Sequence, residues 1–428
     1  MEESVQRRVG VLSRLLLLPL EADNSLEKVL LRGGFTEQEE EAVTNPVVIG
    51  GMILDIHGIA LVPPSPRTTS PGKINYVPGG VARNIAECMA KLDTKPYMIS
   101  VVGLDMAGKQ LFEQWKGFGL STEGIQKHPH IKTAVVCNII NTEGEVAAGI
   151  ASVEAIEKFL TPEWIQQSRT KIISAPILMV DANLGLPALE ASCQMAAECD
   201  IPVWFEPVSV TKSRRIASVV KFVTFVSPNE DELVAMANAL SSRDSFFPIE
   251  KDDRKKFSAE YLFKMLKPAI LVLLEKGIKL VFLTLGENGV FLCSKGSKFM
   301  KLSLEKTRTH KPTKKLYHLV APSCPAMRTF EIRQTTDLTS DVFAVHFPAL
   351  PASIVRLTGA GDCLVGGTLA SLCSGLDVMQ SVAVGIAVAK STVEAETNVP
   401  AAFDLAKIAG DASLVYSAAK VLFSNSGP

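Results

Sequence analysis

Short apolar runs alternate with segments of helical character along most of the chain from Asn45 onward. The runs Val47–Ile49, Ile177–Val180 and Leu280–Leu285 contain almost no polar residues, as expected of strands that are buried on both faces of a sheet. Further strands are predicted at 97–102, 203–205 and 222–226, and helices at 81–92, 106–118, 187–199, 230–240 and 258–275. This order predicts an α/β fold, a three-layer α/β/α sandwich with a mostly parallel central sheet.

Two segments interrupt this order. Residues Ile59–Val77 and Thr133–Ile150 alternate in polarity and contain turn residues, among them Thr142-Glu143-Gly144. Alternation with a period of two is typical of half-buried antiparallel strands. We therefore expect two ribbons, at about 56–78 and 130–150, which form a small β lid over one end of the sheet.

The overall composition excludes several classes of protein. The 428 residues include 44 basic and 45 acidic side chains, a net charge of −1, which argues against nucleic acid or a membrane surface as a partner. A hydrophobic fraction of 47% excludes a mostly disordered chain. The eight cysteines include no Cys-x-x-Cys pair, which indicates reduced thiols in an intracellular protein and not a disulfide framework or a zinc site.

Residues 1–44 are interpreted as an N-terminal extension, and residues 45–428 as one domain. In the extension, Arg8-Val9 and Leu15-Leu16 are separated by five residues, a spacing that resembles the N-terminal peroxisomal signal. That signal has His or Gln in place of Leu15. An amphipathic helix or a disordered leader is the alternative interpretation, so the expected location is peroxisomal or cytoplasmic.

A second addition is predicted at about 298–340. Between residues 298 and 333 it carries nine basic and two acidic side chains. We expect a surface insertion there, and a phosphate- or partner-binding role is the open alternative.

The late segment Thr358-Gly359-Ala360-Gly361-Asp362 is the sharpest motif in the chain. Small residues at the start of a helix allow an anion to approach backbone N–H groups at the positive end of the helix dipole. Such a site can stabilise the charge on a phosphoryl group during its transfer. Asp362, in the first helical turn, is placed to accept the proton of a substrate hydroxyl. An ordinary glycine-rich turn is the alternative, and the chain contains no Gly-Lys-Ser or Gly-Lys-Thr that would indicate a P-loop.

An early motif has a related form. Gly79 and Gly80 precede a predicted helix in which Asn84 lies one turn from the start. Backbone N–H groups and an amide placed in this way can bind sugar hydroxyls. A flexible loop that enters a helix is the alternative.

Together, Gly-Gly-x-x-x-Asn and Gly-Ala-Gly-Asp resemble the two signatures of the ribokinase-like (PfkB) carbohydrate kinases. The resemblance covers about Asn45 to Ser417 and implies the ribokinase-like fold. It also implies that Asp362 is the catalytic base, that Gly359, Ala360 and Gly361 stabilise the phosphoryl group, and that ATP and Mg²⁺ are used.

Two further segments fit the nucleotide side of this family. Asn229 and Glu232 match its Asn-x-x-Glu motif, which implies that Asn229 contacts the cofactor and that Glu232 holds Mg²⁺ through water. Their alternative is a helix capping box. The second segment carries Thr284, Gly286 and Gly289 and resembles the strand and turn beside the nucleotide, where a plain hairpin is the alternative.

On the substrate side, the family has an aspartate near the end of the first strand that binds sugar hydroxyls, and Asp55 is identified with it. The stretch around Arg83 and the segment Glu206–Lys212 are most similar to the pseudouridine kinase branch, in its plant type. This similarity implies transfer of the ATP γ-phosphoryl group to the 5′-hydroxyl of pseudouridine. The resemblance assigns four residues to the ribose: Asp55, Gly79, Gly80 and Asn84. It assigns Thr133 and Asn183 to the nucleobase, and Lys212 to the cofactor.

One departure from the family concerns potassium. Arg356-Leu357 stands where the family has Asp-Thr, and that aspartate helps to bind an activating potassium ion. A guanidinium would repel the cation or replace it, so we expect weak dependence on potassium. The resemblance also implies a homodimer formed through the lid. The alternatives are a kinase for another nucleoside or sugar and a non-catalytic family member that acts as a binding or scaffold protein.

Overall fold

A computed structural model describes residues 44–63, 67–142, 146–241, 245–250, 257–296, 299, 304, 315–325 and 342–422. The chain divides into two units, Met1–Val43 and Thr44–Pro428, and the described residues all belong to the second. The predicted targeting segment, the turn Glu143-Gly144 and most of the basic insertion therefore lie outside the described residues. The peroxisomal or cytoplasmic location stays a prediction.

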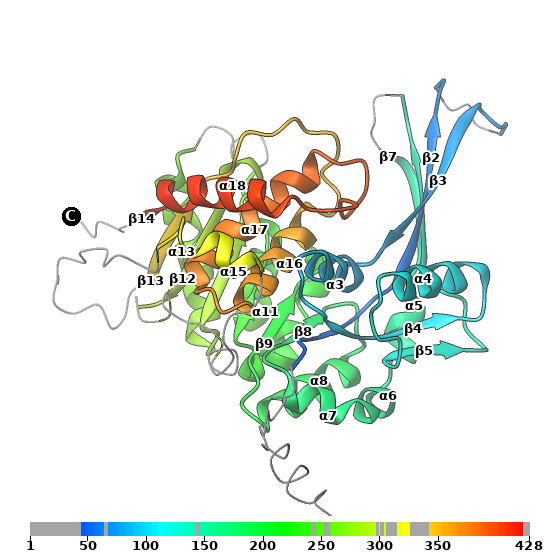
Figure 1. Ribbon diagram of the computed structural model, residues 1–428, viewed down its shortest axis with the longest axis horizontal. Helices are drawn as coiled ribbons and strands as arrows, with labels where there is room; N and C mark the ends of the chain where they lie inside the picture. The colour runs from blue at the N-terminus through cyan, green and yellow to red at the C-terminus, as the bar shows by residue number, and fades with distance from the viewer. Residues whose placement is uncertain are drawn as a thin grey trace, which may run out of the picture. The chain divides into compact units, whose positions relative to one another are not determined.

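A ten-stranded sheet forms the centre of the second unit, in the order β14-β13-β12-β11-β10-β9-β8-β1-β4-β5 (Figure 1). Strands β1, β4, β5 and β8 to β11 run parallel to one another, whereas β12 to β14 are added antiparallel at one edge. The mostly parallel sheet predicted from the sequence is confirmed. Its strands are β1 (Val47–Ile49), β4 (Tyr97–Gly103), β5 (Ile125–His128), β8 (Leu178–Asp181), β9 (Val203–Glu206), β10 (Phe225–Val226), β11 (Leu280–Thr284), β12 (Val290–Lys295), β13 (Val342–Phe347) and β14 (Lys420–Leu422).

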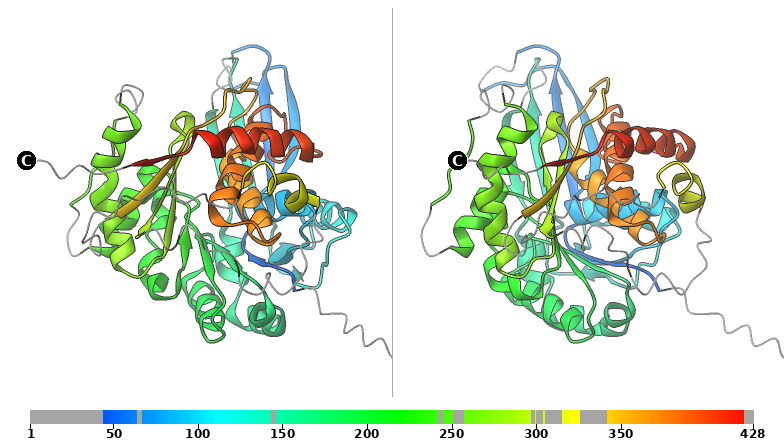
Figure 2. Two further views of the ribbon diagram at one scale, coloured as in Figure 1. Left: turned by 60° about the vertical axis from the view of Figure 1, so that its left-hand side comes forward. Right: turned by 90° about the vertical axis from the view of Figure 1, so that its left-hand side faces the viewer.

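Helices cover both faces of this sheet. Figure 2 shows the orange and red helices on one side of the strands and the green helices on the other. The first face carries α3 (Val81–Lys91), α4 (Met106–Gly117), α15 (Lys315–Val320), α16 (Ala360–Leu372), α17 (Val378–Val393) and α18 (Leu405–Ala418). The second face carries α5 (Glu154–Phe159), α6 (Pro162–Gln167), α7 (Arg169–Ser174), α8 (Leu186–Ala197), α10 (Ile216–Val219), α11 (Glu230–Leu240) and α13 (Ala259–Glu275). The short helix α9 (Val210–Ser213) follows β9.

Alternate residues of the strands supply the two hydrophobic cores. Val48 packs into the core on the first face, whereas its neighbours Val47 and Ile49 pack into the core on the second. Because successive side chains of a strand point to opposite faces, a wholly apolar run is required only where both faces are buried. This pattern explains why the buried strands were visible in the sequence.

One predicted strand is shorter in the structure than expected. Residues 222–226 were expected to be extended, but Val220–Phe222 form a 3-10 turn, η1, and β10 contains only Phe225 and Val226. The turn lies directly after α10, and the chain becomes extended only after it. Apolar side chains alone do not distinguish such a turn from a strand.

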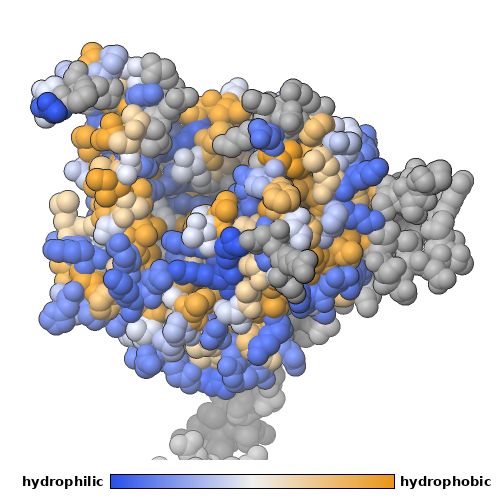
Figure 3. Space-filling view, turned by 180° about the vertical axis from the view of Figure 1, so that it is seen from behind, coloured by the Kyte–Doolittle hydropathy of each residue, from blue (hydrophilic) through white to orange (hydrophobic). Residues whose placement is uncertain are grey.

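A second, four-stranded sheet has the order β3-β2-β6-β7, made of β2 (Ile53–Ala60), β3 (Gly72–Gly79), β6 (Val135–Ile140) and β7 (Val146–Ser152). We call this sheet the lid. The ribbons β2–β3 and β6–β7 are antiparallel, and the parallel pair β2–β6 joins them. Figure 3 shows the surface hollowed between the lid strands and the rest of the unit.

The register of the lid separates its side chains into two faces. Asp55 and His57 alternate with Ile56 and Gly58 along β2, so the two pairs point to opposite faces.

No helix among the described residues is long and apolar enough to span a bilayer.

Candidate active site

The two glycine-rich motifs meet through Asn84 and Asp362. The Asn84 side chain, on α3, donates from Nδ2 to Oδ2 of Asp362 at 2.6 Å, although the two residues lie 278 positions apart. Gly366 allows this approach, because a Cβ at that position would lie 2.7 Å from the Cβ of Cys88 on α3. The close packing of α3 against α16 therefore brings the predicted base to the predicted sugar-binding helix.

Asp362 is the third residue of α16, which begins after Gly359. Gly359 has a φ of 87°, and a Cβ there would lie 2.1 Å from the carbonyl oxygen of Asn398. Only glycine fits this position. Gly361, by contrast, has open space where a side chain would be, so an anion can approach the first turn of the helix.

Burial raises the pKa of Asp362 to about 6, and the carboxylates of Asp181 and Asp55 act in the same direction. The Asn84 hydrogen bond and the charge of Arg83 act against this rise. A carboxyl group with a pKa near 6 is mostly ionised at neutral pH but is a stronger base than an exposed aspartate.

Asp55 lies in the lid and not at the end of the first strand, where the sequence interpretation placed it. Strand β1 ends at Ile49, and Asp55 is the third residue of β2. Its Oδ2 accepts a hydrogen bond from Nδ2 of Asn398 at 3.2 Å. A Cβ at position 79 would lie 2.2 Å from the same Oδ2, so the predicted Gly79 is needed for Asp55 to reach the site.

Three site residues were missed from the sequence: Asp181, Asn398 and Arg83. Asp181 ends β8 and is fully buried, and its carboxylate accepts N–H bonds from Gly51 at 3.1 Å and Ala82 at 3.3 Å. The position of an aspartate at the end of a buried strand was a usable signal, because ligands bind at the carboxyl edge of such sheets. Nothing in the sequence marked Asn398.

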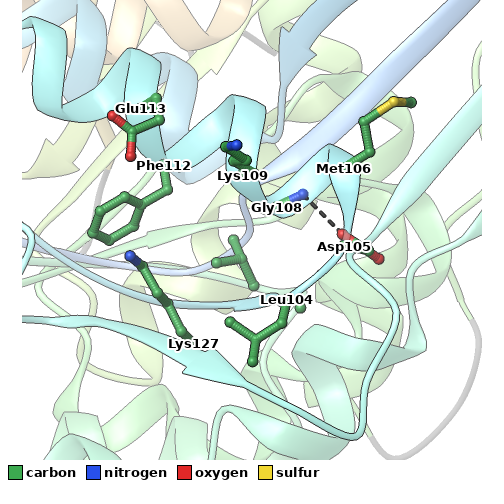
Figure 4. A pocket seen from close by; sticks show the side chains of 10 residues that line it. Leu104, Asp105, Met106, Gly108, Lys109, Phe112, Glu113 and Lys127 are labelled. Atoms are coloured by element: carbon green, nitrogen blue, oxygen red, sulfur yellow. Dashed lines mark hydrogen bonds between the residues drawn. The ribbon is translucent and has the colours of Figure 1, made fainter.

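Thr133 and Asn183 were predicted to contact the nucleobase of the substrate. Thr133 precedes β6, is buried, and donates from Oγ1 to Asp105 at 2.6 Å while accepting from the Gly103 N–H at 2.9 Å. Its hydroxyl is therefore engaged at the start of α4. A hollow beside that helix is lined by Leu104, Lys109, Phe112 and Lys127 among others, and it contains none of the predicted site residues (Figure 4).

Asn183 and Lys212 lie together. Lys212 Nζ donates to Oδ1 of Asn183 at 2.6 Å, and Nδ2 of Asn183 donates to Oδ2 of Asp181 at 3.0 Å. Lys212, which was assigned to the cofactor, thus contacts a residue assigned to the substrate.

The nucleotide segments are side by side. The Thr284 N–H donates to the carbonyl oxygen of Pro228 at 2.9 Å, and Thr284 forms an isolated bridge with Asn229. Gly286 opens a 3-10 turn, η2 (Gly286–Asn288), and Gly289 has a φ of 88°. A Cβ at position 289 would lie 2.0 Å from the carbonyl oxygen of Phe347.

Asn229 and Glu232 form the capping box that the sequence left as an alternative. The Asn229 side chain accepts the Glu232 N–H, and Oε2 of Glu232 accepts the Asn229 N–H, each at 2.9 Å. The pKa of nearby Glu206 is raised well above its usual range by burial and by the charges of Glu232 and Asp362.

Arg356 spans the lid and the loop after α17. Its Nη1 donates to the carbonyl oxygen of Glu396 at 2.9 Å, and its Nη2 lies 2.6 Å from Nδ1 of His57. A guanidinium can only donate, so Nδ1 accepts and the ring is neutral. Burial and the Arg356 charge both lower the pKa of His57, in agreement with this assignment.

Comparison with known proteins decides the family. The sequence profile described as pfkB family carbohydrate kinase matches residues 43–309 and 334–399. The chain belongs to the pfkB family of carbohydrate kinases. It is 52% identical, over 88% of its length and 98% of the relative, to pseudouridine kinase of Arabidopsis thaliana.

More distant comparisons agree with this family. The kinase is 29% identical to pseudouridine kinase of Escherichia coli, over 46% of this chain and 63% of the relative. The structure of Arabidopsis thaliana ribokinase complexed with ribose and ATP has a TM-score of 0.63 at 17% identity, with 86% of this chain and 99% of that chain covered. This last similarity shows the ribokinase-like fold, and family membership implies that ATP is the phosphoryl donor.

The residues on the nucleotide side fit a magnesium ion. Glu232 uses Oε2 in the capping box, so its second carboxylate oxygen takes no part in that box. Burial raises the pKa of Glu232, and a cation beside it would favour the ionised form. Among the described residues no three His, Cys, Asp or Glu side chains gather into a metal cage.

The raised pKa of Asp362 predicts that the activity of the kinase falls on the acid side of its pH profile. We call this fall the acid limb. Below a pH of about 6 the carboxyl group is protonated and cannot accept the hydroxyl proton, so kcat/KM should fall tenfold per pH unit. Steady-state assays from pH 5 to 8 at saturating ATP measure this limb. Protonation of ATP also lowers activity in this pH range, but its contribution would be the same in all variants. Asn84→Ala, by contrast, should move the acid limb that is due to Asp362 to higher pH. A limb that stays in place in Asn84→Ala would contradict the assignment.

Proposed function

We propose that the kinase phosphorylates the 5′-hydroxyl of pseudouridine to give pseudouridine 5′-phosphate. The observation that carries the proposal is the hydrogen bond between Asn84 and Asp362, because a base and a sugar-binding residue would have to lie together in one site. The choice of pseudouridine is supported by the 52% identity to a pseudouridine kinase. The intact Asp362 and Gly359–Gly361 argue against a non-catalytic protein.

The mechanism assigns a separate task to each part of the site. The Asp55 carboxylate accepts hydrogen bonds from neighbouring ribose hydroxyls, with the Gly79–Gly80 turn and Asn84 beside it. Asp362 takes the proton of the 5′-hydroxyl as the oxygen bonds to the γ-phosphorus, and ADP leaves with the electrons of the broken phosphorus–oxygen bond. Backbone N–H groups at Gly359–Gly361 stabilise the charge on the phosphoryl oxygens during transfer.

Mg²⁺ would enter with ATP and neutralise phosphate charge. Glu232 is the residue that would hold it, with Glu206 nearby. Asp55 of the lid acts electrostatically on Asp362, so we expect that closure of the lid on the substrate would exclude water and limit wasteful hydrolysis of ATP.

A coupled assay of ADP formation tests the proposed substrate. Pseudouridine, uridine, adenosine and ribose are compared at equal concentration, and pseudouridine should give the highest kcat/KM. Preference for another acceptor would show a sibling kinase, and no ADP formation with any acceptor would favour a binding protein.

Potassium should have little effect on this kinase. The Arg356 guanidinium donates to the Glu396 carbonyl oxygen, so a fixed positive charge is already bound to a backbone oxygen there. Activity should change by less than about twofold when potassium chloride replaces tetramethylammonium chloride at constant ionic strength. The matched variant Arg356→Asp should gain activation by potassium. Strong saturable activation of the unaltered chain would contradict the prediction.

We also propose a homodimer through the lid. The register places Ile74, Tyr76, Ile139 and Ile150 on the face opposite Asp55, and their side chains are 60%, 50%, 38% and 78% exposed. A contiguous apolar face of this kind is typical of an interface. The hydrophobic residues along the lid are visible in Figure 3.

Sedimentation velocity at micromolar concentration should find a dimer that Ile150→Asp converts to a monomer. Because Ile150 is exposed in one chain, the change should leave the fold intact. Leu414→Asp, at a position on α18 that is also exposed, is the control and should stay dimeric. A monomeric unaltered chain, or a dimeric Ile150→Asp variant, would exclude this interface.

A further inference from the structure

Arg83 lies beneath the active site and contacts both sides of the sugar-binding turn. The side chain is 3% exposed. Its Nε donates to the carbonyl oxygen of Gly79 and its Nη2 to that of Pro78, each at 2.9 Å. Nη2 also donates to Oδ1 of Asn84, and Nη1 pairs with the carboxylate of Glu87. These bonds thus join the end of β3 to α3, the helix that follows it.

The contact with Asn84 decides which end of that amide faces the base. A side-chain amide has an acceptor oxygen and a donor nitrogen of nearly equal size, so its orientation depends on its partners. Arg83 has only donors, and Asp362 as a carboxylate has only acceptors. With Oδ1 held by Arg83, Nδ2 must point to Asp362, as the 2.6 Å bond shows.

The titratable groups around Asp362 lie on four elements. Asp55 on β2, Asp181 on β8 and Glu206 on β9 are acidic neighbours, and Arg83 on α3 is the cation among them. The Arg83 charge lowers the pKa of both Asp362 and Asp55. Arg83 therefore offsets a repulsion that would otherwise favour protonation of the base.

Glu87 holds this guanidinium in place with Oε2, whereas Lys91 is bound to its other carboxylate oxygen, Oε1. Glu87 lies between the two cations, and Lys91 Nζ donates to Glu87 and to the carbonyl oxygen of Pro400 at 2.7 Å. A planar guanidinium gives several fixed donor directions, which a lysine ammonium does not reproduce. The network is therefore suited to fixing the direction of the Arg83 donors, in addition to balancing charge.

We propose that Arg83 is a positioning residue for the transfer: it holds Oδ1 of Asn84 so that Nδ2 fixes the Asp362 carboxylate at the substrate hydroxyl. This role rests on the proposed kinase activity, but not on pseudouridine as the acceptor.

A double-mutant cycle tests the role. Arg83→Lys keeps the positive charge beside Glu87 but loses the fixed N–H directions of the guanidinium. Asn84→Ala removes the amide itself. The readout is the acid limb of kcat/KM for each single variant and for the pair, with thermal unfolding measured alongside. Lys91→Gln is the control, because Lys91 belongs to the same buried network and does not contact Asn84.

Asn84→Ala should move the limb upward by about one pH unit, because a hydrogen bond to the ionised carboxylate is lost. Arg83→Lys should move it in the same direction by a smaller amount and lower kcat/KM at pH 7 about tenfold. On the Asn84→Ala background, Arg83→Lys should cause no further shift, since it acts through the missing amide. Lys91→Gln should leave the limb unchanged.

Three results would overturn the proposal. A uniform loss of kcat/KM at all pH values in Arg83→Lys would show a structural role alone. Additive shifts in the double variant would show that Arg83 acts without Asn84, and an equal shift in Lys91→Gln would show a general effect of charge. The limb is measured with whichever acceptor the kinase uses, so a different acceptor would refute pseudouridine and leave the test of Arg83 intact.

Discussion

Asp362→Asn should give a folded protein whose turnover is at least ~100-fold slower, the lower end of the loss expected when a general base is removed. Asparagine has the shape of aspartate, and its Oδ1 can still accept the hydrogen bond that Nδ2 of Asn84 donates at 2.6 Å. It cannot accept the proton of the acceptor hydroxyl. The loss should therefore appear in kcat, with little change in the KM values.

The same variant should be more stable at neutral pH. A carboxyl group in an unfolded chain titrates near 4, and in the folded protein the pKa of Asp362 is about 6, so the ionised form is disfavoured by folding. The destabilisation grows as pH rises through this interval and is fully present above it. A neutral side chain removes it.

Single-turnover kinetics and thermal unfolding at pH 7.5 measure both effects. Asp93→Asn, at an exposed position, is the control and should change neither quantity. Turnover near that of the unaltered chain would refute Asp362 as the base. A lower unfolding temperature with lost activity would instead indicate damage to the fold.

Asp55→Asn should raise the KM for the acceptor about ten- to a hundredfold, because charge-assisted hydrogen bonds to two hydroxyls become neutral ones. The asparagine Oδ1 can still accept from Nδ2 of Asn398, so β2 should keep its place. The KM for ATP serves as an internal control and should change much less.

Titration calorimetry with the acceptor and steady-state kinetics check this second prediction. An unchanged KM for the acceptor would show that Asp55 does not bind the ribose. An equal rise in both KM values would indicate that the lid had been displaced as a whole.

The sequence predicted those parts of the site that depend on near neighbours in the chain. The capping box of Asn229 and Glu232 needs only a spacing of three residues on one helix, and the structure forms it. The helix that begins after Gly359 was likewise visible, since three small residues precede an aspartate in its first turn. The strands Val47–Ile49 and Leu280–Thr284 were marked by apolar residues that both faces of the sheet require.

Residues that depend on distant contacts were missed or misplaced. Asp55 was read as the end of the first strand, but Gly50 and Gly51 break the chain there and the residue belongs to the lid. Thr133 was read as a lid residue, but Asp105 and Gly103 hold its hydroxyl. Asn398, which holds Asp55, carried no local signal because its partner lies 343 positions away.

The sequence by itself determined the α/β architecture, the two glycine-rich helix starts and the family to which they point. Only the tertiary structure decided that Arg83 donates to Oδ1 of Asn84, that Nδ2 of Asn84 meets Asp362, and that Arg356 meets His57 of the lid. The periodicity of apolar residues and the spacing of motif residues predict only local backbone structure, within a few helical turns or one strand. A contact across 278 positions forms only when packing brings two elements together, and here it is the absence of a side chain at Gly366 that allows α16 to lie against Cys88 of α3.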